Sequence, residues 1–433
     1  MTIETLYQHF LKSSGVCTDT RKITANCIFF ALKGDNFNAN EFAAKAIEQG
    51  ASLAIIDEKE YAQDERFVLV EDVLATLQQL AREHRRSFTI PVIGLTGSNG
   101  KTTNKELLAA VLGQKYKVHA TKGNLNNHIG VPLTLLEMTA DTEMAIIEMG
   151  ANHQKEIEML SNICEPTHGF ITNIGKAHLE GFGGVEGIRK GKGELFDFLK
   201  ESNGYVFLNE KDAILVELAK EKELLLTIRY GADKRALECK ATSPRIDFIL
   251  PESLDREQTK YATNLSGAYN FDNMQTAFAI GVFFNVPAKD AAEALAAYES
   301  SNNRSQLVQK ENLTLHLDAY NANPSSMEAS IKNFAGLKTN RKKAVFLGDM
   351  FELGVDAEKE HAALGKLVAS FNFDTVVLYG ENMKAALLHL PKAYYFTDKF
   401  SIHNWTADFD FSSYEVLIKG SRGTSLETVV PFV

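Results

Sequence analysis

Cysteine, proline and tryptophan are scarce in this chain of 433 residues, which contains 4, 9 and 1 of them respectively. The cysteines, at positions 17, 27, 164 and 239, form neither a C-x-x-C pair nor a Cys/His cluster with zinc-site spacing. Scattered thiols are typical of a reduced cytoplasmic protein rather than of a disulfide scaffold. Apolar runs such as Ala277 to Phe284 are far shorter than the ~20 residues that cross a bilayer. We therefore expect a cytoplasmic protein without membrane insertion.

Positive charge is also in deficit, because 46 lysines and arginines face 56 acidic residues and the net charge is −10. Proteins that neutralise nucleic-acid phosphates need a basic surface, so no nucleic-acid partner is expected. A small anion could still be bound by a local site. The first residues combine an acidic Glu4 with an amphipathic helical pattern over 3–11, which is not typical of a signal peptide.

The chain is long enough for about three domains, and its apolar runs indicate where they divide. Residues 1–86 contain short runs at 28–32, 53–56 and 67–70 and a helical stretch at 41–49, and they end in the charged segment 82–86. Strands then alternate with helices, which favours parallel α/β sheets. We predict a small N-terminal α/β domain (1–86), a central P-loop ATPase-type domain with a mostly parallel sheet (87–302) and a C-terminal Rossmann-like domain (303–433).

A glycine-rich loop, TGSNGKTT at 96–103, lies between a predicted strand at 91–95 and a predicted helix at 102–112. Backbone N–H groups in such a turn and the helix N-terminus that follows can bind a phosphate. Lys101 would supply a charge for the β- and γ-phosphates, and Thr102 a hydroxyl for Mg²⁺. The strict Walker spacing requires glycine where Leu95 stands, so the loop is a variant. A plain strand–helix turn with a solvent-facing lysine is the alternative.

Three further residues follow predicted strands or lie in an unusual motif. Glu148 ends the strand at 145–148, and His178 comes shortly after the one at 169–173. Ligands of open parallel sheets bind beyond the carboxyl ends of the strands, and Mg²⁺ prefers oxygen ligands. Capping of the next helix is the alternative role of Glu148. Lys192 lies in RKGKGE at 189–194, whose composition alone favours a solvated basic turn.

The order of these motifs resembles the Mur ligase family, ATP-dependent enzymes that form amide bonds in peptidoglycan precursor synthesis. After the loop at 96–103, EMGA (148–151), NIGKAH (173–178), KGE (192–194) and LSGAYNFDN (265–273) follow in the family's order. DAYNANPSSM (318–327), LGDMFELG (347–354) and NLNNHIGVPLT (124–134) resemble the branch that joins D-alanyl-D-alanine to UDP-N-acetylmuramoyl-tripeptide. The Asp-Asn-Pro-Arg motif of the branch that adds the third amino acid does not occur.

The resemblance implies roles for individual residues. It assigns catalysis to Lys101, Glu148, His178 and Lys192. It places two Mg²⁺ ions, one at Thr102 and Glu148 and one at His178 and Lys192, with Lys192 carbamylated by CO₂ so that an amine becomes an oxygen-bearing anion. It assigns ATP binding to Thr96, Gly97, Ser98, Asn99, Gly100, Lys101, Thr102, Thr103, Asn270, Asn273, Arg304, Asp318 and Tyr320.

The resemblance also implies substrate contacts and a reaction. The contacts are Thr20, Asn40, Asn126, Asn127, Asn321, Asn323 and Lys419; Asn40 lies in NANEF at 38–42, where the family has an Asp-Gly pair. The expected reaction activates a carboxylate with ATP as an acyl phosphate, which the dipeptide amine then attacks. A monomer is expected. Alternatives are a third-residue-adding or folylpolyglutamate synthase-like ligase, or a P-loop switch that binds ATP without forming a bond.

Overall fold

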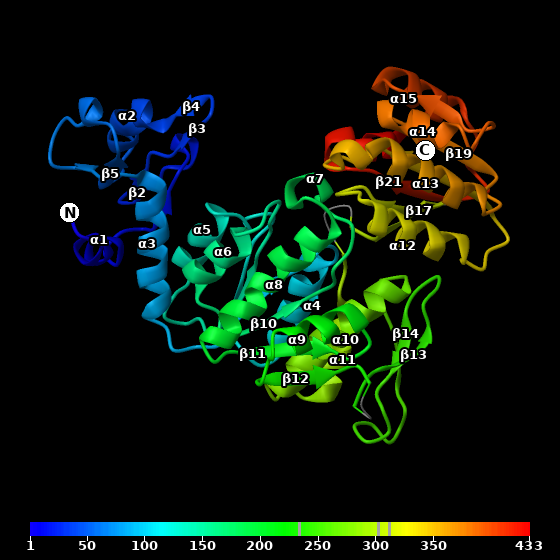
Figure 1. Cartoon of the computed structure of the whole chain (residues 1–433), viewed down its shortest axis with the longest axis horizontal. Helices are drawn as coiled ribbons and strands as arrows, with labels where there is room; N and C mark the ends of the chain where they lie inside the picture. Colours follow the sequence, from blue (N-terminus) through cyan, green and yellow to red (C-terminus); the bar gives the residue numbers. More distant parts are fainter. Residues whose placement is uncertain (233–234, 301–303, 311–312) are drawn as a thin grey trace.

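The computed structural model describes residues 1–232, 235–300, 304–310 and 313–433. Three groups of elements follow one another along the chain, and the N-terminal and C-terminal groups lie at opposite ends of the long axis (Figure 1). The α/β fold with three units that the sequence predicts is confirmed. The expected boundary between residues 302 and 303 lies outside the described residues. Within the described part of the chain, no helix is both long and apolar enough to cross a membrane.

The N-terminal unit contains a parallel sheet in the order β1-β2-β5-β6. Its interior is apolar because Ile28, Phe30 and Ile55 are fully buried. The predicted helix at 41–49 begins at Ala43, after a short 3-10 turn. The elements are α1 (Ile3–Phe10), β1 (Val16–Cys17), β2 (Ile28–Phe30), β3 (Lys33–Gly34), β4 (Phe37–Asn38), α2 (Ala43–Glu48), β5 (Leu53–Ile56), β6 (Phe67–Leu69) and α3 (Val73–Arg86).

The charged segment 82–86 is the end of α3 rather than a linker. His84 and Arg85 are buried, and the Arg85 guanidinium donates to the carbonyl oxygens of Cys164 and Glu165 at 3.0 Å. Arg82 and Arg86 both pair with the Glu165 carboxylate. The long side chains at the end of α3 therefore dock this helix on the central unit.

The central sheet has the order β12-β11-β10-β7-β9-β8, with neighbouring strands parallel. Alternate side chains face opposite sides: Val92 and Ile147 contact the layer of α5, α6 and α8, whereas Ile93 and Ile146 contact α4, α10 and α11. The elements are β7 (Val92–Thr96), α4 (Lys101–Leu112), β8 (Val118–Ala120), α5 (Gly130–Leu136), β9 (Met144–Glu148), α6 (Glu156–Cys164), β10 (His168–Ile171), α7 (Leu179–Phe182), α8 (Val185–Glu201), β11 (Tyr205–Asn209), α9 (Ala213–Glu221), β12 (Thr227–Tyr230), β13 (Glu238–Ala241), β14 (Asp247–Ile249), β15 (Lys260–Ala262), α10 (Ala268–Phe283) and α11 (Ala288–Ala297).

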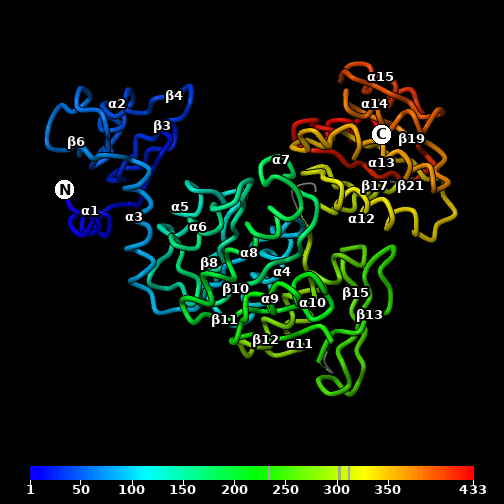
Figure 2. The backbone as a smooth tube through the Cα atoms, viewed as in Figure 1, coloured from blue at the N-terminus to red at the C-terminus, as the bar shows by residue number. Residues whose placement is uncertain are grey.

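The C-terminal sheet has the order β16-β17-β21-β18-β19-β20, and only β16, among its described strands, runs antiparallel to its neighbour. The tube in Figure 2 shows this unit stacked above the end of the central unit that carries α7. The elements are β16 (Gln306–Lys310), β17 (Leu313–Asp318), α12 (Pro324–Ala335), β18 (Lys342–Gly348), α13 (Ala357–Ala369), β19 (Thr375–Tyr379), α14 (Lys384–Leu387), β20 (Tyr394–Phe396), α15 (Lys399–Asp408) and β21 (Tyr414–Lys419).

Candidate active site

The glycine-rich loop (96–103) connects the end of β7 to α4. Gly97 and Gly100 have φ angles of +149° and +76°, which residues with a Cβ rarely adopt. A Cβ on Gly97 would also lie 1.9 Å from the hydroxyl oxygen of Thr172. Leu95, at the Walker glycine position, is a fully buried strand residue. The variant spacing therefore follows from a strand that continues to Thr96.

Lys101 is the first residue of α4 and lies half-buried in the cavity wall. Its Nζ donates to the Gly97 carbonyl oxygen at 2.7 Å. Burial lowers the pKa of Lys101, and the nearby Glu148 carboxylate opposes that shift. An ammonium has three protons, so this one can also donate to an anion at the helix N-terminus. The alternative of a lysine that only faces solvent does not fit this geometry.

Glu148 ends β9 with its side chain buried beside the loop. Its Oε1 accepts hydrogen bonds from the Thr102 hydroxyl at 3.2 Å and from the Asn126 amide at 2.8 Å. Its Oε2 is buried without a hydrogen-bond partner. The next helix, α6, begins only at Glu156, so Glu148 does not cap it. A buried carboxylate oxygen without a donor is a place for a cation.

A cavity of about 710 Å³ lies in front of this loop, between the central and C-terminal units. The carboxyl ends of β7, β9 and β10 meet at its floor because these strands are neighbours in the sheet. Predicted site residues that line it are Ser98, Asn99, Gly100, Lys101, Thr102, Thr103, Asn126, Asn127, Glu148, His178, Asn270, Asn273, Arg304, Asp318, Tyr320, Asn321, Asn323 and Lys419. Predicted residues outside its lining are Thr20, Asn40, Thr96, Gly97 and Lys192.

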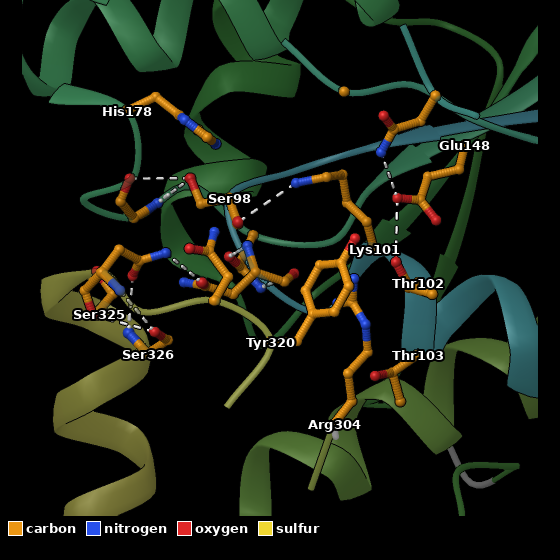
Figure 3. Close-up of a pocket in the computed structure, with 18 of the residues that line it drawn as sticks. Ser98, Lys101, Thr102, Thr103, Glu148, His178, Arg304, Tyr320, Ser325 and Ser326 are labelled. Atoms are coloured by element: carbon orange, nitrogen blue, oxygen red, sulfur yellow. Dashed lines mark hydrogen bonds between the residues drawn. The ribbon is translucent and has the colours of Figure 1, made fainter. Parts of the chain in front are cut away.

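The C-terminal unit closes one side of the cavity (Figure 3). The Arg304 guanidinium lies 3.5 Å from the centre of the Tyr320 ring. The Asn323 amide donates to the Asn99 side-chain oxygen at 2.8 Å, so the start of α12 touches the glycine-rich loop directly. Lys419 is buried, and its Nζ pairs with Asp318 at 2.6 Å. The Lys419 charge is thus already neutralised within its own unit.

Two asparagines of α10 lie behind the loop. Asn273 accepts a hydrogen bond from the Asn104 amide at 2.7 Å and donates to the Asn270 oxygen at 3.2 Å. A Cβ on Gly100 would lie 2.9 Å from the Asn273 oxygen. The predicted adenine-side residues are therefore within contact of the glycine-rich loop, although their part in adenine binding stays a prediction.

His178 and Lys192 occupy different environments. His178 has a left-handed backbone, with φ of +56°, and its Nδ1 lies against the Glu352 carboxylate of the C-terminal unit. Lys192 is fully buried within α8. Its Nζ donates to the carbonyl oxygen of Ala151, a residue of the cavity lining, at 3.2 Å. Burial and the positive charge of Lys101 bring the pKa of Lys192 well below its ordinary value. The solvated basic turn that composition favours is wrong.

Comparison with known proteins agrees with this architecture. The Mur ligase middle domain matches residues 95–281, the Mur ligase glutamate ligase domain 303–404 and the Mur ligase family catalytic domain 12–85. A UDP-N-acetylmuramoyl-tripeptide–D-alanyl-D-alanine ligase of Bacillus subtilis is 34% identical over 96% of this chain and 92% of its own length. The chain belongs to the Mur ligase family. The predicted membership is confirmed.

Solved structures of the Mur ligase family extend the likeness to the fold. A MurF crystal structure from Acinetobacter baumannii has a TM-score of 0.88 and 29% identity, covering 98% of this chain and 97% of its own. The MurF ligase of Thermotoga maritima in complex with ADP has a TM-score of 0.83 and 27% identity, with the same coverage. Both comparisons cover all three units, so the arrangement is shared as a whole.

The two substrate residues that the sequence predicts in the N-terminal unit of this Mur ligase lie away from the cavity. Thr20 belongs to a short turn capped by Asp19. Asn40 is fully buried, and its amide is engaged on both sides, since it donates to Asp57 at 2.8 Å and accepts from the Asp57 N–H at 3.1 Å. Asn40 therefore braces the N-terminal unit, and its contact with a substrate stays a prediction.

Three residues in or next to the cavity of this Mur ligase were not singled out from the sequence: Ser325 lines it, and Asn104 and Glu352 contact residues that do. Asn104 holds Asn273, and Ser325 accepts a hydrogen bond from the Lys176 N–H at 2.8 Å. Glu352 faces His178. Ser325 and Glu352 lie in quoted motifs, but nothing in a linear motif says which of its side chains reaches another unit. Asn104 lies one helical turn after Gly100, which is the signal that could have identified it.

Proposed function

We propose that this chain is an ATP-dependent ligase that joins D-alanyl-D-alanine to UDP-N-acetylmuramoyl-tripeptide in peptidoglycan precursor synthesis. The observation that carries the proposal is the glycine-rich loop with Lys101 and the unsatisfied Glu148 oxygen, opening into a cavity that the DAYNANPSSM segment closes. The likeness to relatives named for this activity supports the same substrates.

The chemical problem is that a carboxylate is anionic and a poor electrophile. In the proposed reaction, a carboxylate oxygen of the tripeptide attacks the γ-phosphorus of ATP. The bond between that phosphorus and the β–γ bridging oxygen breaks, ADP departs, and the tripeptide carboxylate becomes an acyl phosphate. The neutral amine of the dipeptide then attacks the acyl carbon and loses a proton, and inorganic phosphate leaves. Lys101 and the N–H groups of the loop would stabilise charge on the transferred phosphoryl group.

Mg²⁺ fits the site through oxygen donors. The unpartnered Oε2 of Glu148 and the Thr102 hydroxyl beside it are the donors that the proposal assigns to a first ion. Bound there, Mg²⁺ would neutralise phosphate charge. Among the described residues, no group of three or more His, Cys, Asp or Glu side chains gathers to hold a metal. This agrees with an ion that keeps water and phosphate oxygens as ligands.

We also propose a carbamate at Lys192 and a second Mg²⁺ near His178. Only a neutral amine reacts with CO₂, and the lowered pKa of Lys192 supports that form. The Lys192 Nζ donates a hydrogen bond to the carbonyl oxygen of Ala151, and Ala151 lines the cavity. The Glu352 carboxylate beside His178 Nδ1 can orient the imidazole.

The three units suggest a division of labour, with the domain limits 1–86, 87–302 and 303–433 as part of the proposal. The first unit would bind the UDP moiety, the second ATP, and the third the dipeptide through Asn321 and Asn323. Closure of the third unit onto the second would keep water from the acyl phosphate. All four cysteines are free thiols, in keeping with the cytoplasm as the proposed location, and a monomer as the acting form.

The test is an ADP-release assay with UDP-N-acetylmuramoyl-tripeptide and ATP, with and without D-alanyl-D-alanine. The proposal expects ADP release to depend on the dipeptide and a product that contains it by mass spectrometry. Dependence on a single amino acid would favour a third-residue-adding ligase, and dependence on glutamate with a folate a folylpolyglutamate synthase-like enzyme. Slow ATP turnover that ignores every amine would favour the ATP-binding switch.

A further inference from the structure

The segment 172–178 is joined to the glycine-rich loop by hydrogen bonds. The Ser98 N–H donates to the Asn173 carbonyl oxygen at 3.0 Å, and the Ser98 hydroxyl donates to that of Gly175 at 2.9 Å. The Asn99 N–H donates to the Asn173 side chain at 3.0 Å, and the Thr172 hydroxyl donates to the Asn99 carbonyl oxygen at 2.7 Å. A displacement of this segment would therefore displace the loop.

The same segment holds the C-terminal unit on its other side. The Lys176 N–H donates to the Ser325 hydroxyl at the start of α12, at 2.8 Å. The Lys176 Nζ pairs with Glu360 Oε1 of α13 at 2.7 Å. In Figure 3, Ser325 lies at the start of α12, whereas Ser98 and His178 lie on loops of the central unit. One short segment thus connects the loop to two helices of the C-terminal unit.

The Lys176–Glu360 pair is unequal in its exposure. Glu360 is 6% exposed, whereas the Lys176 side chain is 47% exposed. A carboxylate removed from water needs a charged or hydrogen-bonding partner, and Lys176 of the central unit supplies one. A flexible, half-exposed lysine loses little when the units separate, because water can replace the carboxylate. The pair is therefore suited to favour closure without making it permanent.

We propose that Lys176 and Glu360 form a latch that favours the closed arrangement of the central and C-terminal units. Both are positioning residues, because neither lines the cavity in which the proposed reaction takes place. The proposal rests on the function proposed above. Dipeptide bound by the C-terminal unit meets the tripeptide only in the closed arrangement, so the latch sets the fraction of enzyme competent to use it.

The test compares Lys176→Met, Glu360→Gln and the charge swap Lys176→Glu/Glu360→Lys with the unaltered chain. Methionine keeps the Lys176 N–H bond to Ser325 and removes only the charge. Each single variant should raise the KM for D-alanyl-D-alanine about fivefold, as loss of one ion pair predicts, while kcat and the KM for ATP change less than twofold. The swap should restore the KM to within about twofold.

The matched control is Lys359→Met, which removes a neighbouring lysine of α13 from its exposed pair with Asp356, and its KM should not change. Small-angle X-ray scattering with a non-hydrolysable ATP analogue reports the latch independently of turnover. The single variants should have a larger radius of gyration than the unaltered chain, and the swap should not. If ADP release by the unaltered chain does not depend on the dipeptide, the proposed function is wrong, and the radius of gyration alone then tests the latch. Unchanged KM and radius in both single variants, or no recovery in the swap, would overturn it.

Discussion

Lys101 and Lys419 both lie near the carboxyl end of a strand and both face the same cavity, one from the central unit and one from the C-terminal unit. Lys101 donates to a backbone carbonyl of its own loop and is half-buried. Lys419 is 1% exposed and pairs with Asp318 at 2.6 Å. A lysine that donates to a carbonyl can turn to an incoming phosphate, whereas a buried lysine paired with a carboxylate that is only 20% exposed stabilises its own unit.

The largest effect should come from Lys101→Ala. Loss of the only charge that the loop places at the γ-phosphate should lower dipeptide-dependent ADP release about 10³-fold or more, by analogy with removal of other transition-state donors. The melting temperature should stay close to that of the unaltered chain. Lys115→Ala, just beyond the far end of α4, where Lys115 Nζ donates to the Asn285 carbonyl oxygen, is the control and should keep full activity. If Lys101→Ala released ADP about as fast as the Lys115→Ala control, the distinction drawn between Lys101 and Lys419 would not hold.

The next largest effect should come from Lys192→Ala. If a carbamate forms at this buried amine, its loss should lower the rate about 10²-fold, and formate or acetate should restore part of it. Lys190→Ala, an exposed position of the same helix, should behave as the unaltered chain does. Full activity in Lys192→Ala, or loss that no carboxylate relieves, would remove the carbamate from the mechanism.

Glu148→Gln should have a smaller effect that Mg²⁺ can offset. The amide keeps the bond to Thr102 within reach but supplies no negative charge, so the Mg²⁺ concentration for half-maximal rate should rise about tenfold. Titration of ADP release against Mg²⁺ measures this, with Glu137→Gln at an exposed surface pair as the control. Identical titrations for Glu148→Gln and the unaltered chain would argue against metal binding there.

Lys419→Met should change stability more than chemistry. It leaves Asp318, largely withdrawn from water, without its cation and should reduce the free energy of unfolding by about 1–3 kcal/mol. Urea unfolding measures the loss, and the double variant Lys419→Met/Asp318→Asn should recover most of it because no charge is left unpaired. Should Lys419→Met be stable but as inactive as Lys101→Ala, Lys419 would be the phosphate-binding lysine.

Strand ends were the part of the site most open to prediction. The apolar runs before Lys101, Glu148 and His178 indicate buried parallel strands, and neighbouring parallel strands bring their carboxyl ends to one edge. The structure places all three residues in one cavity. The variant spacing at Leu95 was equally visible, but its cause, a strand continuing to Thr96, required the structure.

Burial inside polar segments was not open to prediction. The segment 82–86 is highly charged and the composition of 189–194 favours a solvated basic turn, yet Arg85 and Lys192 are buried. Arg85 is satisfied by carbonyl groups some 80 residues away in the chain, at Cys164 and Glu165. Local patterns report periodicity and charge, and they carry no information about partners from another unit.

Asn40 makes the same point for a motif. Its segment was expected to face a substrate, but the amide is used within the N-terminal unit, on Asp57. Whether a polar asparagine contacts a ligand depends on the neighbours that surround it in the folded protein.

The order of motifs along the chain was sufficient to identify the family and the α/β architecture and to predict a phosphate-binding loop, because glycines, strand ends and helix starts act over a few residues. Pairing between side chains far apart in the chain was decided only by the tertiary structure. Lys419 and Asp318 are separated by 101 positions in the chain, and Lys176 and Glu360 by 184. Contacts over such separations leave no periodic pattern in the sequence.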